Sequence, residues 1–250
     1  MKLNLCIPIP IRFTNINKVK SIIDKAIKSK PNLIELRFDY ITDIQNFSID
    51  FLKELLKIIR PHAAVIFTLR DSSEGGHLKI NPKERSKILK ILINSTPDYL
   101  DIEMNTDISI LEEIITLAFQ NEIKIIFSYH DFEKTLGFDD SIRLIRNFNE
   151  RLFRELGLDS KKLKENIFKL IFTAQNFEDN LIALRLCKDL SKSNQKIISF
   201  CMGSLGLLSR IMCVLAGSFL TYTFLDEETA SGQINIKEMQ EIYNVTQNSS

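Results

Sequence analysis

One lysine lies inside one of the most apolar stretches of the chain. Lys169 stands within Ile167–Thr173, between Phe168 and Leu170. Lysine is rarely buried without a reason, and burial favours the neutral amine over the ammonium ion. A neutral amine is a nucleophile that forms imines with ketones and aldehydes. The alternatives are a lysine that extends to solvent from the start of a strand, or one paired with an acid such as Asp101 or Glu103.

A histidine stands directly after another apolar run. His130 follows the segment Lys124–Tyr129, which has the pattern of a buried strand. Histidine changes its charge near neutral pH, so a histidine at the end of a strand suits a proton-transfer role. A structural or solvated histidine is the alternative.

Charged residues alternate with apolar ones in the segment that begins at Leu33. Glu35, Arg37 and Asp39 fall on one face of a strand, because side chains two positions apart point the same way. Buried charges are costly unless they are paired. The pattern therefore indicates either a self-satisfied ion-pair network or a polar ligand site.

An arginine and a glutamate follow the next apolar run, Ala64–Leu69. Arg70 stands at its end, where its planar guanidinium can bind an anion through two parallel hydrogen bonds. Glu74 precedes Gly75 and Gly76, which suit either a mobile loop that closes over a site or an ordinary turn.

Two later junctions are rich in small and polar residues. The segment Met202–Arg210 carries two glycines and ends on Arg210, which is expected one to two turns into a helix. Near the other end of the chain, Thr229–Gln233 forms a hydrogen-bonding loop that begins with Thr229 and ends with Gln233.

These residues belong to a regular alternation of short apolar runs and amphipathic segments. The expected strands are Leu3–Ile7, Leu33–Phe38, Ala64–Leu69, Tyr99–Met104, Lys124–Tyr129, Ile167–Thr173, Lys196–Phe200 and Phe219–Phe224. The expected helices are Val19–Lys28, Ile49–Ile59, Lys83–Ile93 with Pro82 at its start, Ile108–Phe119, Asp139–Leu156, Phe177–Leu190, Gly206–Ala216 and Ile236–Tyr243.

Eight strand–helix pairs in about 250 residues predict an α/β fold, a (β/α)8 TIM barrel that forms a single domain over residues 1–250. An open doubly wound sheet is the second choice, but Gly-x-Gly-x-x-Gly is absent from the first strand–helix turn. The polar segment Asn149–Asn166 is expected to be an extended helix end or a surface insertion. In such a barrel the strand ends that carry these polar residues gather at one face.

Composition excludes several classes of protein. The net charge of +1 gives no basic excess for nucleic acid or an anionic membrane. The longest uncharged run, Ile211–Leu225, is 15 residues, shorter than a membrane span. No signal peptide is expected, since prolines interrupt the apolar start of the chain. The four cysteines stand in apolar stretches typical of reduced thiols, and no metal-ligand spacing occurs. A cytoplasmic location follows.

Six motifs together resemble type I 3-dehydroquinate dehydratase, the imine-forming enzyme of the shikimate pathway. They occur in order over nearly the whole chain: Glu35-Leu36-Arg37, Arg70 with Glu74-Gly75-Gly76, Ser128-Tyr129-His130-Asp131-Phe132, Lys169, Met202-Gly203 with Ser209-Arg210, and Thr229-Ala230-Ser231-Gly232-Gln233. The last segment departs from the Ser-Ala-Pro-Gly-Gln of the family at Thr229 and at Ser231. Cys6 stands where the family often has a serine, so no substrate contact is assigned to it.

The resemblance implies a hydro-lyase that converts 3-dehydroquinate to 3-dehydroshikimate in aromatic amino acid biosynthesis. Lys169 would form the imine, His130 would act as general base and acid, and Glu74 would orient His130. The residues implied to bind the substrate are Glu35, Arg37, Arg70, Arg210, Thr229 and Gln233. It further implies no metal or organic cofactor, a small-molecule substrate and a homodimer. The alternatives are a class I aldolase on the same fold and a non-catalytic barrel that binds a small acid.

Overall fold

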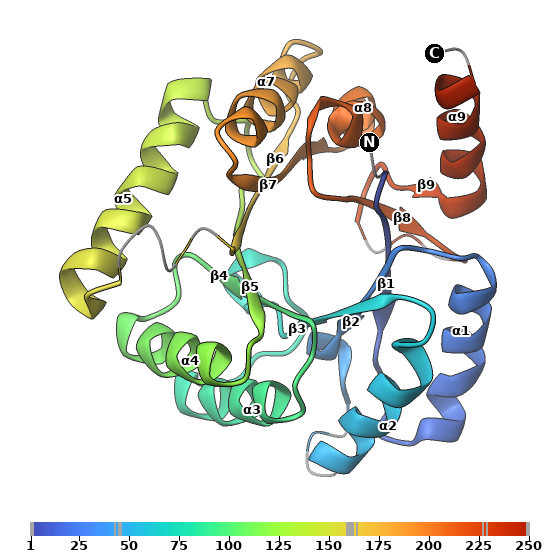
Figure 1. Cartoon of the computed structure of the whole chain (residues 1–250), viewed down its shortest axis with the longest axis vertical. Helices are drawn as coiled ribbons and strands as arrows, with labels where there is room; N and C mark the ends of the chain where they lie inside the picture. The colour runs from blue at the N-terminus through green and yellow to red at the C-terminus, as the bar shows by residue number, and fades with distance from the viewer. Residues whose placement is uncertain are drawn as a thin grey trace. The chain divides into compact units, whose positions relative to one another are not determined.

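Strands and helices alternate along the chain in the computed structural model, which describes residues 3–42, 44, 47–158, 163, 165–226, 228 and 230–248 (Figure 1). The strands are β1 (Leu5–Pro10), β2 (Leu33–Arg37), β3 (Ala64–Thr68), β4 (Tyr99–Glu103), β5 (Lys124–His130), β6 (Ile167–Thr173), β7 (Lys196–Met202), β8 (Thr221–Phe224) and β9 (Ile234–Asn235). The helices are α1 (Ile16–Lys28), α2 (Ile49–Ile59), α3 (Pro82–Asn94), α4 (Ile108–Gln120), α5 (Phe138–Leu156), α7 (Asp179–Lys192), α8 (Leu207–Ala216) and α9 (Ile236–Asn248). Short 3₁₀ helices are η1 (Phe38–Tyr40), η3 (Ser72–Glu74) and η4 (Ser204–Gly206).

The strands form one nine-stranded sheet in the order β7-β6-β5-β4-β3-β2-β1-β8-β9. The pairs β1–β8, β2–β3, β3–β4, β6–β7 and β8–β9 are all parallel. Parallel neighbours separated by helices are the arrangement that the alternating sequence pattern predicts for a (β/α)8 fold. Consecutive strands β2 to β7 are also consecutive in the sheet, which confirms the predicted fold class.

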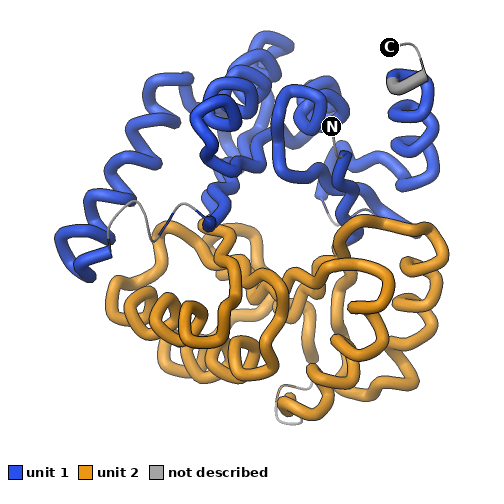
Figure 2. The backbone as a smooth tube through the Cα atoms, viewed as in Figure 1, with its two compact units in different colours: residues 1–7, 128–250 blue, residues 8–127 orange. Residues whose placement is uncertain are grey.

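The chain divides into two compact units (Figure 2). Unit 1 comprises residues 1–7 and 128–250, and unit 2 comprises residues 8–127. In unit 1, α7 and α8 pack against β7 and against each other. In unit 2, α1 packs against α2 and α3 against α4. The single domain expected over residues 1–250 stays a prediction.

Local capping fixes where several helices begin. Ser48 caps α2 by accepting a hydrogen bond from the backbone N–H of Phe51, and Asn81 caps α3 in the same way through Glu84. Pro82 occupies the first turn of α3, where its missing N–H costs nothing. These side chains explain why the predicted starts of α2 and α3 lie within one residue of the observed ones.

Some boundaries differ from the prediction. β1 spans Leu5–Pro10, where the expected strand was Leu3–Ile7, so it includes both Pro8 and Pro10. α7 begins two residues later than predicted, at Asp179, whose backbone N–H donates to the side-chain oxygen of Asn176. The Asp179 carboxylate in turn accepts from the backbone N–H groups of Gln175 and Asn176, which fixes the turn before the helix. The two-residue strand β9 was not predicted. Helix α5 continues to Leu156, as predicted for the first part of 149–166, while 159–162 and 164 lie outside the described residues.

The strands that carry candidate site residues are buried on both faces, as in a sheet covered by helices. All of β6 from Ile167 to Phe172 is buried, Lys169 included. All four cysteines are buried and none forms a disulfide, in agreement with the sequence analysis. Among the described residues, no helix is long and apolar enough to span a bilayer.

Candidate active site

Lys169 lies in the middle of β6 with 4% of its surface exposed. Its Nζ donates a hydrogen bond to the hydroxyl oxygen of Tyr222, at 3.2 Å. The same nitrogen is 4.7 Å from the centroid of the Tyr222 ring. Tyr222 belongs to β8 and is 5% exposed, so the lysine and its partner are both buried in unit 1. The amine thus lies in a desolvated environment, which confirms the expectation that this lysine is buried.

His130 is the last residue of β5 and is half-buried. Its ring stacks on Phe132 with the centroids 6.3 Å apart. The next residue, Asp131, is tied to the strand of Lys169: its backbone N–H donates to the carbonyl of Ile171 at 2.9 Å. Its carbonyl in turn accepts a bond from the hydroxyl of Thr173 at 2.9 Å. These two bonds hold the chain around His130 against the second half of β6.

Arg210 is the most deeply buried charged side chain of unit 1, at 1% exposure. Its Nη2 donates to the carbonyl of Ser231 at 3.2 Å, and its guanidinium lies 4.5 Å from the centroid of the Phe200 ring. Within the described residues its Nε has no hydrogen-bond partner and no carboxylate forms an ion pair with it, although the charge of Glu228 acts on it. Burial lowers the pKa of Arg210 to about 10. The group remains a cation at neutral pH, and it is suited to receive an anion.

The loop before β9 is fixed by main-chain contacts. The Ser231 carbonyl accepts from the backbone N–H of Gly203 at 3.4 Å as well as from Arg210. Gly232 has a φ of +79°, and a Cβ there would lie 2.7 Å from the Gly203 carbonyl oxygen, so only glycine fits. Gln233 follows and is buried, whereas Thr229 lies outside the described residues.

In unit 2 the alternating charges of β2 are paired. Arg37 binds Asp39 through two parallel hydrogen bonds, Nε to Oδ1 at 2.7 Å and Nη2 to Oδ2 at 2.8 Å. Burial alone would raise the pKa of Asp39, but the hydrogen bond and charge of Arg37 hold it below its usual value. Glu35 is buried and accepts a hydrogen bond from the Thr68 hydroxyl on β3. Arg37 and Asp39 therefore form an ion pair, which was one of the two alternatives predicted for this face.

Arg70 is also engaged by carboxylates. Its Nη2 binds Asp101 and its Nη1 binds Glu103, both at 2.8 Å. Burial lowers the pKa of Arg70, but the charges of Asp101 and Glu103 outweigh it, so the net pKa is well above the usual value. Arg85, on α3, reaches the other oxygen of Glu103. The anion-binding fork expected of Arg70 is therefore occupied on two nitrogens by protein carboxylates.

Glu74 ends the short helix η3 and is buried. Asn105 donates to its Oε1 at 3.4 Å. Gly75, the next residue, has a φ of +83°, and a Cβ on Gly76 would lie 2.0 Å from the carbonyl oxygen of Arg70. The glycine pair therefore forms a tight turn that fixes Glu74 relative to the end of β3. A cavity of about 140 Å³ adjoins this turn, lined by Asp71, Ser73, Glu74, Ile80, Pro82, Arg85, Glu103, Asn105, Thr106, Asp107 and Ile110.

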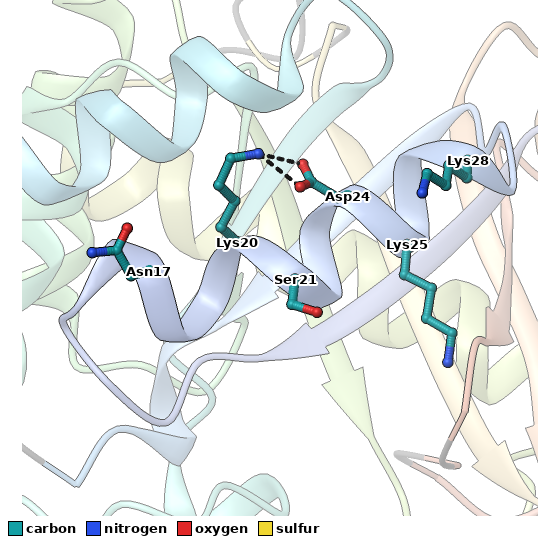
Figure 3. A pocket seen from close by; sticks show the side chains of 6 residues that line it. All are labelled: Asn17, Lys20, Ser21, Asp24, Lys25 and Lys28. Atoms are coloured by element: carbon teal, nitrogen blue, oxygen red, sulfur yellow. Dashed lines mark hydrogen bonds and ion pairs between the residues drawn. The ribbon is translucent and has the colours of Figure 1, made fainter.

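A second hollow lies on α1 and is lined by none of the expected site residues (Figure 3). Its lining comes from one helix: Asn17, Lys20, Ser21, Asp24, Lys25 and Lys28. Lys20 and Asp24 form an ion pair at 2.7 Å in which both side chains are about half exposed. This is the solvated face of an amphipathic helix.

Known proteins resemble the chain over almost its whole length. A model of the type I 3-dehydroquinase family matches residues 6–250. The chain belongs to the type I 3-dehydroquinase family.

The 3-dehydroquinate dehydratases of Thermococcus onnurineus and Clostridioides difficile are each 30% identical to this 3-dehydroquinase chain. The first alignment covers 87% of this chain and 89% of the relative, and the second covers 96% and 91%. The type I 3-dehydroquinate dehydratase of Clostridium difficile, solved with covalent modified comenic acid, is 27% identical with a TM-score of 0.80, over 100% of this chain and 94% of that one. The 3-dehydroquinases are hydro-lyases, so the family places the chain in this class of enzyme.

Sequence reasoning missed two residues of this type I 3-dehydroquinase chain. Tyr222 stands between Thr221 and Thr223 in β8. The only signal in the sequence is one large aromatic side chain between two small hydroxyl side chains. Arg85 follows Lys83 and Glu84 at the start of α3, where a run of charges is typical of an exposed face. Arg85 is instead buried against Glu103, and nothing in the sequence distinguishes it from its neighbours.

Proposed function

We propose that this chain dehydrates 3-dehydroquinate to 3-dehydroshikimate through an imine on Lys169. The observation that carries the proposal is the burial of a primary amine in the middle of the apolar strand β6. A lysine amine is a nucleophile that forms imines with ketones, and this one is held in place by Tyr222. The C. difficile relative was solved with covalent modified comenic acid, which supports covalent chemistry in this family.

In the proposed reaction the Lys169 nitrogen attacks the ring ketone. A C–N bond forms, the carbonyl oxygen leaves as water after proton transfer, and a protonated imine remains. This cation withdraws electrons from the neighbouring C–H bond, so the electron pair left by proton removal is held as a neutral enamine. The enamine then expels the hydroxyl group, and hydrolysis of the imine releases the product and restores the amine.

His130 is proposed to move the protons in these steps. It removes the proton next to the imine as a general base and then donates it to the departing hydroxyl as a general acid. Its place at the end of β5, held by Asp131 against the strand of Lys169, supports this role. Glu74 is proposed to orient His130, and its tight turn gives it a defined position within unit 2.

Arg210 is proposed to bind the carboxylate of the substrate. It is a buried cation, and within the described part of the chain its Nε has no hydrogen-bond partner and no carboxylate forms an ion pair with it. An arginine fork matches a carboxylate geometrically. Arg70, whose nitrogens hold Asp101 and Glu103, is suited to a hydroxyl contact rather than to the carboxylate.

The remaining family positions are proposed to contact ring hydroxyls. They are Glu35, Arg37, Thr229 and Gln233, of which Glu35 and Gln233 are buried. We further propose a cytoplasmic homodimer that uses no metal or organic cofactor.

The test is reductive trapping. The protein is mixed with 3-dehydroquinate and sodium borohydride, which delivers hydride to the imine carbon and leaves a stable secondary amine on Lys169. Mass spectrometry should show one adduct per chain, and peptide mapping should place it on Lys169. Lys169→Ala should lose both the adduct and turnover, while Lys196→Ala, which removes an exposed lysine at the start of β7, should keep both. An adduct on a different lysine, or undiminished turnover in Lys169→Ala, would refute the proposal. A ketose phosphate trapped in place of dehydroquinate would favour the aldolase.

A further inference from the structure

The amine of Lys169 has a hydroxyl partner that no part of the proposed reaction uses. Tyr222 reaches Lys169 from β8, and its oxygen lies 3.2 Å from Nζ. Both residues belong to unit 1 and both are buried. A buried phenol needs a partner for its hydroxyl, and here that partner includes the group expected to react.

The ring of Tyr222 contacts the same nitrogen. The Nζ lies 4.7 Å from the ring centroid, at the hydroxyl end of the ring. The ring is itself held against Phe200 of β7, with the centroids 6.2 Å apart at an interplanar angle of 65°. Tyr222 thus offers Nζ an oxygen acceptor whose position is fixed by the packing of its ring on Phe200.

From this geometry we infer that Tyr222 is a positioning residue for the amine of Lys169 and for the imine formed on it. The inference rests on the proposed function, since it needs Lys169 to be the nucleophile. A neutral amine carries two N–H bonds and one lone pair. When one N–H is donated to the Tyr222 oxygen, the nitrogen can no longer turn freely, and the lone pair has a limited range of directions.

The same contact suits the product of the condensation. When the C–N bond forms and water leaves, the protonated imine keeps one N–H and a positive charge. The Tyr222 oxygen can accept that N–H in a hydrogen bond that the positive charge strengthens. Tyr222 needs to gain or lose no proton in this role, so the balance of the proposed reaction is unchanged.

The flexibility of the lysine side chain is the reason why a positioning residue would help. Its four-carbon side chain has free rotations that must be lost when the nitrogen is oriented for attack. A hydrogen bond already present before the substrate arrives removes part of this cost from the reacting step. The apolar neighbours of Lys169 on β6 restrict its volume but cannot orient its nitrogen, because they accept no hydrogen bond.

The test compares three variants at two tyrosines. Tyr222→Phe removes the hydroxyl and keeps the ring, and Tyr222→Leu removes both. Tyr243→Phe is the matched control, since Tyr243 is also buried in unit 1, on α9, and its hydroxyl donates to the carbonyl of Ile211 at 2.6 Å. The measurements are kcat, KM, the rate of borohydride trapping per folded molecule, and the melting temperature.

Tyr222→Phe should lower kcat and the trapping rate together by about tenfold, the effect of one hydrogen bond near 1.4 kcal/mol. KM should stay close to the wild-type value, because the carboxylate contact of Arg210 is untouched. Tyr222→Leu should lose more. Tyr243→Phe should lower the melting temperature without changing kcat.

Wild-type kcat and trapping rate in folded Tyr222→Phe, with Lys169 still the trapped residue, would overturn this inference and leave the proposed function standing. Trapping at another lysine in the wild-type protein would instead refute the proposed function. If Tyr222→Phe changes only the melting temperature, as Tyr243→Phe should, then Tyr222 is structural and the inference is wrong. Trapping is measured on the folded fraction, so partial unfolding of a variant does not hide the result.

Discussion

Arg210 allows a prediction in which activity falls while the stability of the protein hardly changes. The group has a lower pKa in the folded protein, about 10, than in the unfolded chain, because burial disfavours its charge. The gap between the two values corresponds to about 3 kcal/mol. Between the two pKa values the unfolded state holds more protons. The burial cost therefore applies in full below pH 10 and fades as the pH rises beyond it.

Arg210→Met removes the charge and keeps a side chain of similar length. The gain from the lost burial cost is offset by the lost hydrogen bond to Ser231, about 1 kcal/mol, and by the lost contact with the Phe200 ring, about 1–2 kcal/mol. The free energy of unfolding should therefore stay within about 1 kcal/mol of the wild-type value. Removing one partner of a buried ion pair would instead cost about 3–5 kcal/mol.

The kinetic effect should be large. A charge-assisted hydrogen bond contributes about 1.5–3 kcal/mol, so kcat/KM for 3-dehydroquinate should fall by roughly 10- to 150-fold in Arg210→Met. Arg210→Lys keeps the charge but not the planar fork, and should lose less. The assay combines urea unfolding with steady-state rates followed by the ultraviolet absorbance of the conjugated product. Arg146→Met, on the exposed face of α5, is the control. A destabilised Arg210→Met with normal kinetics would show that Arg210 is a structural ion-pair partner and would refute the reasoning.

The other predictions concern proton transfer and the Glu74 turn. His130→Ala should lose about 10²–10⁴-fold in kcat while Lys169 is still trapped by borohydride, because the nucleophile survives; near-normal turnover would remove His130 from the mechanism. Gly76→Ala should cost about 1–3 kcal/mol of stability and lower kcat, because its Cβ would lie 2.0 Å from the Arg70 carbonyl and must displace the turn that holds Glu74. Gly137→Ala, whose Cβ would have its nearest neighbour at 3.6 Å, should do neither, and equal melting temperatures for the two variants would contradict the steric argument.

The sequence predicted strands and helices well where their periodicity is strong. The strand of Lys169 has the bounds that the apolar run predicted, and α2 has both of its predicted ends, because Ser48 and the apolar stripe agree. The two-residue strand β9 was missed because a segment of that length has no period. The partners of charged side chains were not predicted either. The alternation along β2 predicted that Glu35 and Arg37 share a face, but it did not predict that Arg37 binds Asp39.

The candidate site was predicted as a set of residues, not as a set of contacts. Lys169 and Arg210 were identified from their types and positions, but which nitrogens have partners depends on residues distant in sequence. Tyr222 stands 53 positions from Lys169, and Ser231 stands 21 from Arg210. Such contacts are set by parallel strand register and by loops, which leave no local pattern in the chain.

The loop at Ser231 has a practical consequence. Its carbonyl, rather than its side chain, accepts the bonds from Gly203 and Arg210, and the side chain itself is exposed. All four native cysteines are buried. A cysteine placed at position 231 would therefore be the one thiol open to a maleimide dye, two residues before Gln233. A fluorophore attached there would show in real time whether the loop responds to 3-dehydroquinate.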